Sequence, residues 1–185
     1  YERIGGIAKN VDRSHVGSIA KKSDRLKQLT SDLFDISKVQ SGNENIEFET
    51  LDASELITQA MGESDQEIKD SGLSFCTRLS ENLYISADGK KMSRVIGNLI
   101  GNILKYAQKG TRVFLSVFEK DTMVVIELKN TSASPLDFDE NEITERFVRG
   151  DSSRSKEGNG LGLAIAKSYT LACGGDFQIG IDGDL

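Results

Sequence analysis

A glycine-rich stretch near the end of the chain has the composition of a phosphate-binding loop. "EGNGLGLAIAK" carries Gly158, Gly160 and Gly162 directly before apolar residues with helical spacing. Glycine adopts backbone angles closed to other residues, so a ligand can approach the main chain there, and the start of a helix attracts anions. The stretch lacks the Lys-Ser/Thr of a P-loop and the preceding strand of a dinucleotide fingerprint. The alternative interpretation is a flexible connector.

A second group of polar residues lies in "RVIGNLIGNILKYA", which has helical periodicity. Spacings of four and three place Asn98, Asn102 and Lys105 on one face, beside an apolar stripe. Asparagine is a mediocre helix former, so two of them one turn apart indicate a function. An amide oxygen there could complete the coordination of a Mg²⁺ ion held mainly by phosphate oxygens. A solvated helix face is the alternative.

Positive charge is concentrated just before the glycines, in "TERFVRGDSSRSKEG". Arg146, Arg149, Arg154 and Lys156 lie within this polar segment of an otherwise acidic chain. Arginine matches phosphate oxygens bidentately, and a polar segment flanked by glycine can close over a nucleotide as a lid. An ordinary surface charge run is the alternative.

The composition excludes several classes of function. The 185 residues carry a formal net charge of -6, which argues against binding nucleic acid by bulk electrostatics. Two distant cysteines and one histidine support neither a disulfide framework nor a zinc cluster. No apolar run approaches the roughly 18 residues of a membrane span. We therefore expect a cytoplasmic domain, with any membrane anchor lying outside this chain.

A long helix is predicted for residues 16–40. Its apolar residues follow a heptad seam, and Gly42 is suited to ending the helix; the seam residues are Ile19, Leu26, Leu29, Leu33 and Ile36. A helix with one narrow apolar stripe needs a partner. It either caps its own domain or forms half of a helical hairpin that dimerises.

The remaining chain predicts an α+β sandwich with a mixed sheet. Helices are expected over 53–68, with Asp52 and Glu55 as a capping box, over 89–107, capped by Asp88, and over 161–172. Strands are expected at 45–52, 73–79, 83–86 and 176–181, and as a hairpin over 112–130 that turns at Lys120-Asp121. We place a helical dimerisation segment at 1–43 and a second domain at 44–185.

The order of the asparagine helix, the hairpin, "ERFVRGD" and "GNGLGLAIAKS" resembles the ATP-binding catalytic domain of bacterial sensor histidine kinases. That two-layer α/β sandwich, the GHKL or Bergerat fold, is shared with gyrase, heat-shock chaperones and MutL ATPases. "SDRLKQLTSDLFDISKVQSG" is similar to the second helix of the kinases' dimerisation hairpin. The resemblance implies ATP and Mg²⁺ as cofactors, a homodimer formed through the hairpin, and a response regulator receiver domain as partner.

The resemblance also implies roles for individual residues. Asn102 is the expected Mg²⁺ ligand, with Asn98 in the same box, while Lys105 approaches the phosphates and Tyr106 packs by the adenine. In the lid, Phe147 is the expected aromatic anchor, and Arg149 and Arg154 are candidate phosphate contacts. The nucleotide is expected to contact the backbone of four residues, Gly158, Gly160, Gly162 and Leu163.

Two departures from the family pattern bear on activity. Where the family has Asp-x-Gly-x-Gly, this chain has Asn130, Ser132 and Ser134. An asparagine oxygen accepts the same hydrogen bond from adenine but without charge assistance, which predicts weaker or altered nucleotide binding. His15 lacks the family's sequence context for a phosphoacceptor, so we expect the acceptor histidine upstream of Tyr1 and the chain to be a fragment.

Together these features predict a kinase region that transfers the ATP γ-phosphoryl group to a histidine for relay to a response regulator. One alternative is a degenerate nucleotide-binding or dimerisation module without kinase activity. Another is an ATPase or serine kinase of the same fold.

Overall fold

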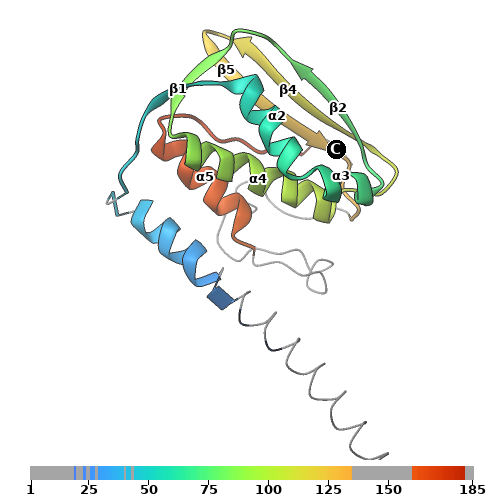
Figure 1. Cartoon of the computed structure of the whole chain (residues 1–185), viewed down its shortest axis with the longest axis horizontal. Coiled ribbons are helices and arrows are strands. Elements are labelled where there is room, and N and C mark those ends of the chain that lie inside the picture. Colours follow the sequence, from blue (N-terminus) through green and yellow to red (C-terminus); the bar gives the residue numbers. More distant parts are fainter. Residues whose placement is uncertain are drawn as a thin grey trace, which may run out of the picture.

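A computed structural model describes residues 19, 23, 26, 27, 29–39, 41, 42, 44–134 and 160–181 (Figure 1). The named strands are β1 (Glu49–Asp52), β2 (Ser74–Leu79), β3 (Tyr84–Ala87), β4 (Arg112–Lys120) and β5 (Met123–Asn130). The named helices are α2 (Ala53–Glu63), α3 (Asp65–Ser71), α4 (Gly89–Tyr106) and α5 (Gly162–Ala172). Residues 29–39 are also helical and are called helix 29–39 below.

The strands form two small sheets, and the helices cover one side of them (Figure 1). β2 runs parallel to β4, and β4 pairs antiparallel with β5, so the larger sheet is mixed as predicted. β1 and β3 form the second, antiparallel sheet. No helix among the described residues is long and apolar enough to span a membrane.

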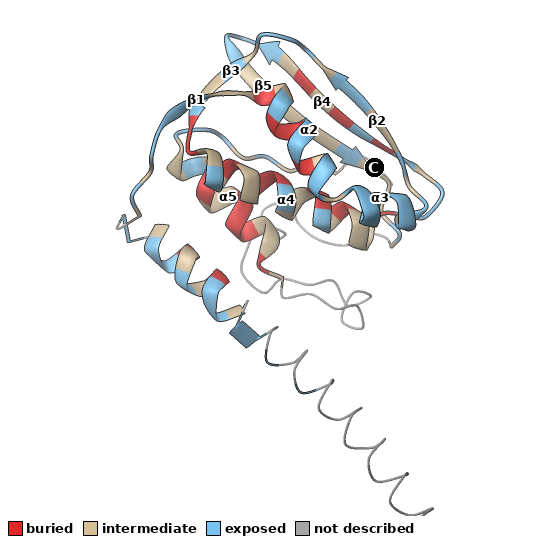
Figure 2. Cartoon of the chain, viewed as in Figure 1, coloured by how far each residue is buried: buried red, intermediate tan, exposed pale blue. Residues whose placement is uncertain are grey.

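The core lies between the larger sheet and the helix layer, where α2, α4 and α5 meet (Figure 2). Alternate residues of β4 point into it, and Val113, Leu115 and Val117 are fully buried. Ile96 and Ile100 of α4 are buried from the other side. Because α4 is buried along one stripe, its polar residues must lie on the faces next to that stripe.

The hairpin turns one residue later than predicted. Asp121 and Thr122 both have left-handed φ angles, 49° and 67°, and Lys120 pairs with Met123. A two-residue turn of this kind matches the right-handed twist of the flanking strands.

Three other boundaries differ from the prediction. The helix expected over 53–68 breaks at Ser64, whose N–H bonds to the carbonyl oxygens that end α2, and α3 starts anew at Asp65. β1 begins at Glu49 rather than at residue 45, because the Glu47 N–H donates to the Asp88 side chain instead of to a ladder. Residues 176–181 form no strand, because they pair with none of the described strands.

Asp88 begins α4, as predicted, and also joins it to the preceding segment. Its carboxylate accepts hydrogen bonds from the N–H of Lys91 and of Glu47, each 3.1 Å long. Burial raises the pKa of this carboxyl, but these backbone N–H groups and the Lys91 ammonium outweigh it, so its pKa lies below the usual range.

We expect Asp88→Ala to lower the free energy of unfolding by about 1–2 kcal/mol at pH 7, the cost of a lost N-cap. Because its pKa is lowered in the folded state, the contribution of Asp88 is present above the unfolded value of about 3.9 and is lost as pH falls through the folded pKa. Urea unfolding at several pH values checks this. Asp52→Ala, which removes the N-cap of α2, is the matched control. If the difference in free energy of unfolding between the parent chain and Asp88→Ala stays constant down to pH 2, the prediction is wrong.

Candidate functional site

The predicted polar face of α4 meets the start of α5. The nearest atom to a Cβ built on Gly162 would be Asn98 Oδ1, at 3.5 Å. Asn98 Nδ2 is buried and makes no hydrogen bond within the described chain. A buried donor without a partner costs free energy, so its presence at this junction points to a group that accepts its hydrogen bond.

The backbone at the start of α5 contains a glycine in the left-handed region. Gly160 has a φ of 66°, in the left-handed region that favours glycine. Leu161, in the N-cap position, is buried and gives no side-chain cap, so the helix begins without one. The N–H groups of the first turn have no partner within the helix and can bind an anion.

Further along α4, Asn102, Lys105 and Tyr106 are each half-buried. Asn102 lies one turn from Asn98, as the spacing predicts, and within α4 both fall on the face beside the buried stripe. The Lys105 ammonium lies 4.9 Å from the centre of the Tyr106 ring. The helix therefore presents two amides and one ammonium in sequence along one side.

The segment after β5 is held against the end of α4. Ala133 N–H donates to the Tyr106 carbonyl and Gln108 N–H to the Thr131 carbonyl, both at 2.9 Å. Ser132 also forms a bridge with Ala107. These bonds bring the segment that starts at Asn130 next to the last turn of α4, although the two are distant in sequence.

Ser132 and Ser134, at positions where the resemblance implies glycines, make a local turn. Ser132 Oγ donates to the Ser134 carbonyl at 2.7 Å and accepts from the Ser134 N–H at 3.3 Å. Both serines and Asn130 are half-buried. The hydroxyl of Ser132 therefore takes up backbone groups that a glycine would leave available.

Part of the predicted site lies outside the described residues, namely Phe147, Arg149, Arg154 and Gly158. The structure brings together Asn98 and Gly162, and separately Tyr106 and the segment after Asn130. Leu163 is half-buried in the first turn of α5. Within the described ranges, no group of three His, Cys, Asp or Glu side chains could hold a metal ion.

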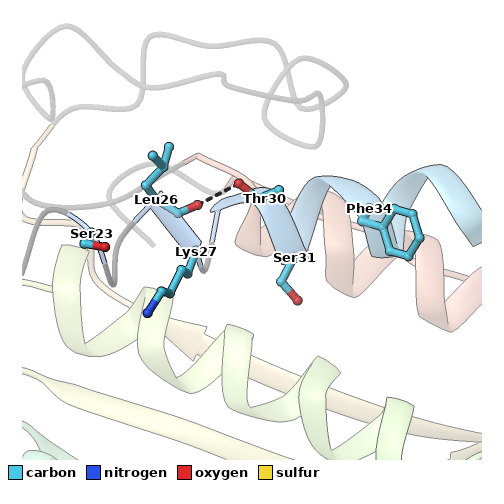
Figure 3. A pocket seen from close by; sticks show the side chains of 6 residues that line it. All are labelled: Ser23, Leu26, Lys27, Thr30, Ser31 and Phe34. Atoms are coloured by element: carbon cyan, nitrogen blue, oxygen red, sulfur yellow. Dashed lines mark hydrogen bonds between the residues drawn. The ribbon is translucent and has the colours of Figure 1, made fainter.

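A hollow of about 470 Å³ lies apart from these residues, along the N-terminal helical residues (Figure 3). Its lining includes Leu26 and Phe34, which are exposed, and Lys27 and Thr30. None of the predicted site residues lines the hollow, so it is separate from the candidate site.

Sequence reasoning missed Arg94, which precedes Asn98 by one turn on the same face of α4 and pairs with Asp32 and Asp35. The spacing of four residues between Arg94, Asn98 and Asn102 is the signal that could have found it.

Comparisons with known proteins identify the family of the chain. A family profile described as "Histidine kinase-, DNA gyrase B-, and HSP90-like ATPase" matches residues 87–183. The chain is 32% identical to the sensor protein VanSC of Enterococcus gallinarum over 91% of its length, covering 47% of VanSC. It is 30% identical to the sensor histidine kinase WalK of Bacillus subtilis (strain 168), over 84% of this chain and 26% of WalK. The chain therefore spans about half or less of these relatives.

Solved structures show the same fold. The histidine kinase AdeS of Acinetobacter baumannii superposes with a TM-score of 0.70 at 17% identity, over 90% of this chain and 77% of AdeS. Full-length ShkA, solved in complex with AMPPNP, gives a TM-score of 0.78 at 24% identity, over 93% of this chain and 36% of ShkA. The chain thus belongs to the histidine kinase-, DNA gyrase B- and HSP90-like ATPases, in the branch of the bacterial sensor histidine kinases.

Proposed function

We propose that this chain is the catalytic region of a sensor histidine kinase, which binds Mg²⁺-ATP and transfers the γ-phosphoryl group to a histidine. The observation that carries the proposal is the junction of α4 with α5, where the buried amide of Asn98 faces Gly162 at a glycine-led helix start. At this junction, α4 supplies the side-chain N–H donors of Asn98 and α5 supplies the backbone N–H groups of its first turn. Together these donors can bind the oxygens of a phosphate chain.

The side chains along α4 fit the expected ligands. Mg²⁺ prefers oxygen ligands and is usually held by few protein groups together with substrate phosphates, so the single amide oxygen of Asn102 is sufficient. The orphaned Nδ2 of Asn98 can donate to a phosphate oxygen, and the Lys105 ammonium adds positive charge. When bound, the metal neutralises charge on the phosphate oxygens.

The residues outside the described ranges complete the proposed site. Phe147, Arg149 and Arg154 would close over the nucleotide, and Gly158 would extend the glycine backbone around its phosphates. With the phosphates held, an imidazole nitrogen attacks the γ-phosphorus, the bond to the bridging oxygen of ADP breaks, and the imidazole proton passes to solvent. The chain's own contribution is to position the phosphates and to balance their charge.

The phosphohistidine would pass its phosphoryl group to an aspartate of a response regulator receiver domain. We further propose that 44–185 is the catalytic unit and 1–43 part of a hairpin that forms a homodimer. The region would work in the cytoplasm, with any membrane anchor elsewhere in the protein. Support for these proposals comes from the relatives, which are named as sensor proteins and sensor histidine kinases.

A calorimetric titration of this chain with ATP, with and without Mg²⁺ and with GTP as control, tests the proposed function. We expect binding that depends on Mg²⁺ and is selective for ATP. No binding by a folded chain would instead favour a degenerate module, for which the Ser132 turn and the missing carboxylate at Asn130 are the structural arguments.

Asn130→Asp is expected to tighten adenine nucleotide binding by about 1 kcal/mol, or roughly fivefold, because a carboxylate strengthens the hydrogen bond to the adenine amino group. The same titration measures the change. Asn45→Asp adds the same charge at an exposed position and is the control. An equal gain in both variants, or no gain at Asn130, would show that the pocket does not use this side chain for adenine.

A further inference from the structure

The larger sheet has a second face, which points away from the helix layer (Figure 1). Because Val113, Leu115 and Val117 of β4 are buried on the helix side, the residues that alternate with them face outward. The pairing of β4 with β2 and with β5 places the outward residues of the three strands side by side, as with Phe114 and Lys129. We call the outward-facing residues of β2, β4 and β5 the outer sheet face.

Apolar side chains are grouped on the outer sheet face. Phe114 is 39% exposed and Met123 is 57% exposed. Cys76 lies beside Phe114 in the register of β2 and β4, and Val125 lies beside Phe118 in the register of β5 and β4. Apolar side chains that face solvent together, unlike scattered ones, indicate a contact surface.

Basic residues surround this apolar group. Arg112 and Lys120 lie at the two ends of β4, while Arg78 lies on β2 and Lys129 on β5. All four are exposed. Glu127, which pairs with Lys129 at 3.1 Å, is the single acidic residue that faces outward from these three strands. The outer sheet face therefore carries a formal charge of +3, on a chain whose net charge is -6.

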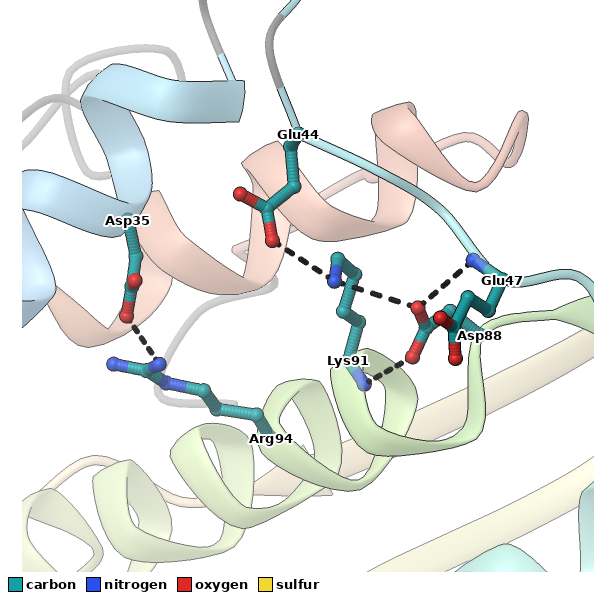
Figure 4. Close-up of polar contacts among 6 residues, drawn as sticks. All are labelled: Asp35, Glu44, Glu47, Asp88, Lys91 and Arg94. Carbon is teal, nitrogen blue, oxygen red and sulfur yellow. Dashed lines mark hydrogen bonds and ion pairs between the residues drawn. The ribbon is translucent and has the colours of Figure 1, made fainter.

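Positive charge is handled differently in the helix layer. There Lys91 lies between two carboxylates of the chain itself, at 2.9 Å from Glu44 and 3.3 Å from Asp88 (Figure 4). On the outer sheet face, the Arg112 guanidinium instead lies 5.6 Å from the centre of the exposed Phe114 ring. Because four positive charges on one face repel one another, an anionic partner is the electrostatic complement of this face.

We propose that the outer sheet face docks on an anionic membrane surface, with Phe114 and Met123 between the lipid headgroups and the four basic residues on their phosphates. The layout favours lipid over an acidic protein, because a planar layer of phosphates can meet cations that lie on all sides of an apolar group. The rest of the chain is acidic, so the same membrane repels it, which fixes the orientation. The junction of α4 with α5 lies on the other side of the sheet and stays open to nucleotide.

Co-sedimentation of this chain with lipid vesicles tests the proposal. We expect binding to vesicles of phosphatidylcholine and phosphatidylglycerol in about equal parts, no binding to phosphatidylcholine alone, and loss of binding at high salt. Arg78→Gln combined with Lys120→Gln should lower the partition coefficient at least about tenfold, since each basic residue near such a surface contributes about fivefold. Lys69→Gln combined with Lys90→Gln removes the same charge from exposed positions of the helix layer and is the matched control, which should bind like the parent chain.

A fluorescent reporter tests which face meets the lipid. The chain contains no tryptophan, so one substitution introduces a single indole. Phe114→Trp should shift its emission to the blue when the phosphatidylglycerol vesicles are added, because the indole leaves water. Phe48→Trp replaces another exposed phenylalanine, directly before β1 and outside the larger sheet, and its emission should not shift.

Three results would overturn the proposal. One is the absence of binding to the anionic vesicles, and another is equal binding by the Arg78 and Lys120 double variant and its control. The third is a blue shift of Phe114→Trp without vesicles: a shift that grows with chain concentration would assign the face to a contact between copies, and one that appears on adding polyglutamate would assign it to an acidic protein. None of these measurements uses nucleotide, so they decide the membrane contact whether or not the chain binds ATP.

Discussion

Asn102→Ala is expected to abolish the Mg²⁺ dependence of ATP binding and to weaken Mg²⁺-ATP binding by roughly ten- to a hundredfold. The range corresponds to about 1.5–3 kcal/mol, the contribution of a polar contact to a charged group. Asn102 is half-buried on the face of α4 beside the buried stripe and does not belong to the hydrophobic core, so its loss should leave the core and the fold intact. Titration of the variant with ATP, with and without Mg²⁺, measures the effect.

The matched control is Asn45→Ala, which removes the same side chain from an exposed position before β1. Asn102→Asp is informative as well, since a carboxylate could still bind Mg²⁺ but would repel the phosphates. If Asn102→Ala binds Mg²⁺-ATP as tightly as the parent chain, Asn102 has no place in the site.

Ile100→Ala should have the largest effect on stability, lowering the free energy of unfolding by about 2–5 kcal/mol. Ile100 is 0% exposed on the buried stripe of α4, where the helix packs against α2, α5 and the sheet. Removing its side chain leaves a cavity in a region held from several sides, which has little freedom to collapse. Urea unfolding of the parent chain and of Ile100→Ala measures the difference in their free energies of unfolding.

Leu171→Ala is the control for this prediction. Leu171 lies near the end of α5 and is 50% exposed, so its truncation should cost well under 1 kcal/mol. A loss below about 1 kcal/mol for Ile100→Ala would mean that α4 is not the packed centre of the domain. Since α4 also carries Asn98 and Asn102, we expect nucleotide binding to be lost at the same denaturant concentration as the fold.

Much of the fold could be predicted because its signals are local. Asp52 and Asp88 mark the starts of α2 and α4, and both accept the capping hydrogen bonds that their positions predict. The alternation in residues 112–130 predicts the hairpin, with its turn misplaced by one residue. These patterns depend only on neighbours in the chain, so they are visible without knowledge of the tertiary structure.

The predictions of secondary structure are wrong where an element depends on a residue that is distant in the sequence. The strand expected at 45–52 starts late because Glu47 bonds to Asp88, 41 residues further along. Residues 176–181 alternate like a strand, but a strand exists only where a neighbour completes its ladder. Likewise, the helix seam of residues 16–40 did not reveal which end packs on the domain: Ile36 is buried, whereas Ile19 and Leu26 are exposed.

The same division holds for the candidate site. Periodicity alone placed Asn98, Asn102 and Lys105 on one face of a helix, and glycine content alone predicted an open backbone before α5. Only the tertiary structure brought Gly162 against Asn98, tied the segment after Asn130 to the end of α4, and paired Arg94 with Asp32 across 62 residues. Local propensity acts through adjacent residues, whereas such contacts form when apolar faces are buried together and carry their polar neighbours with them.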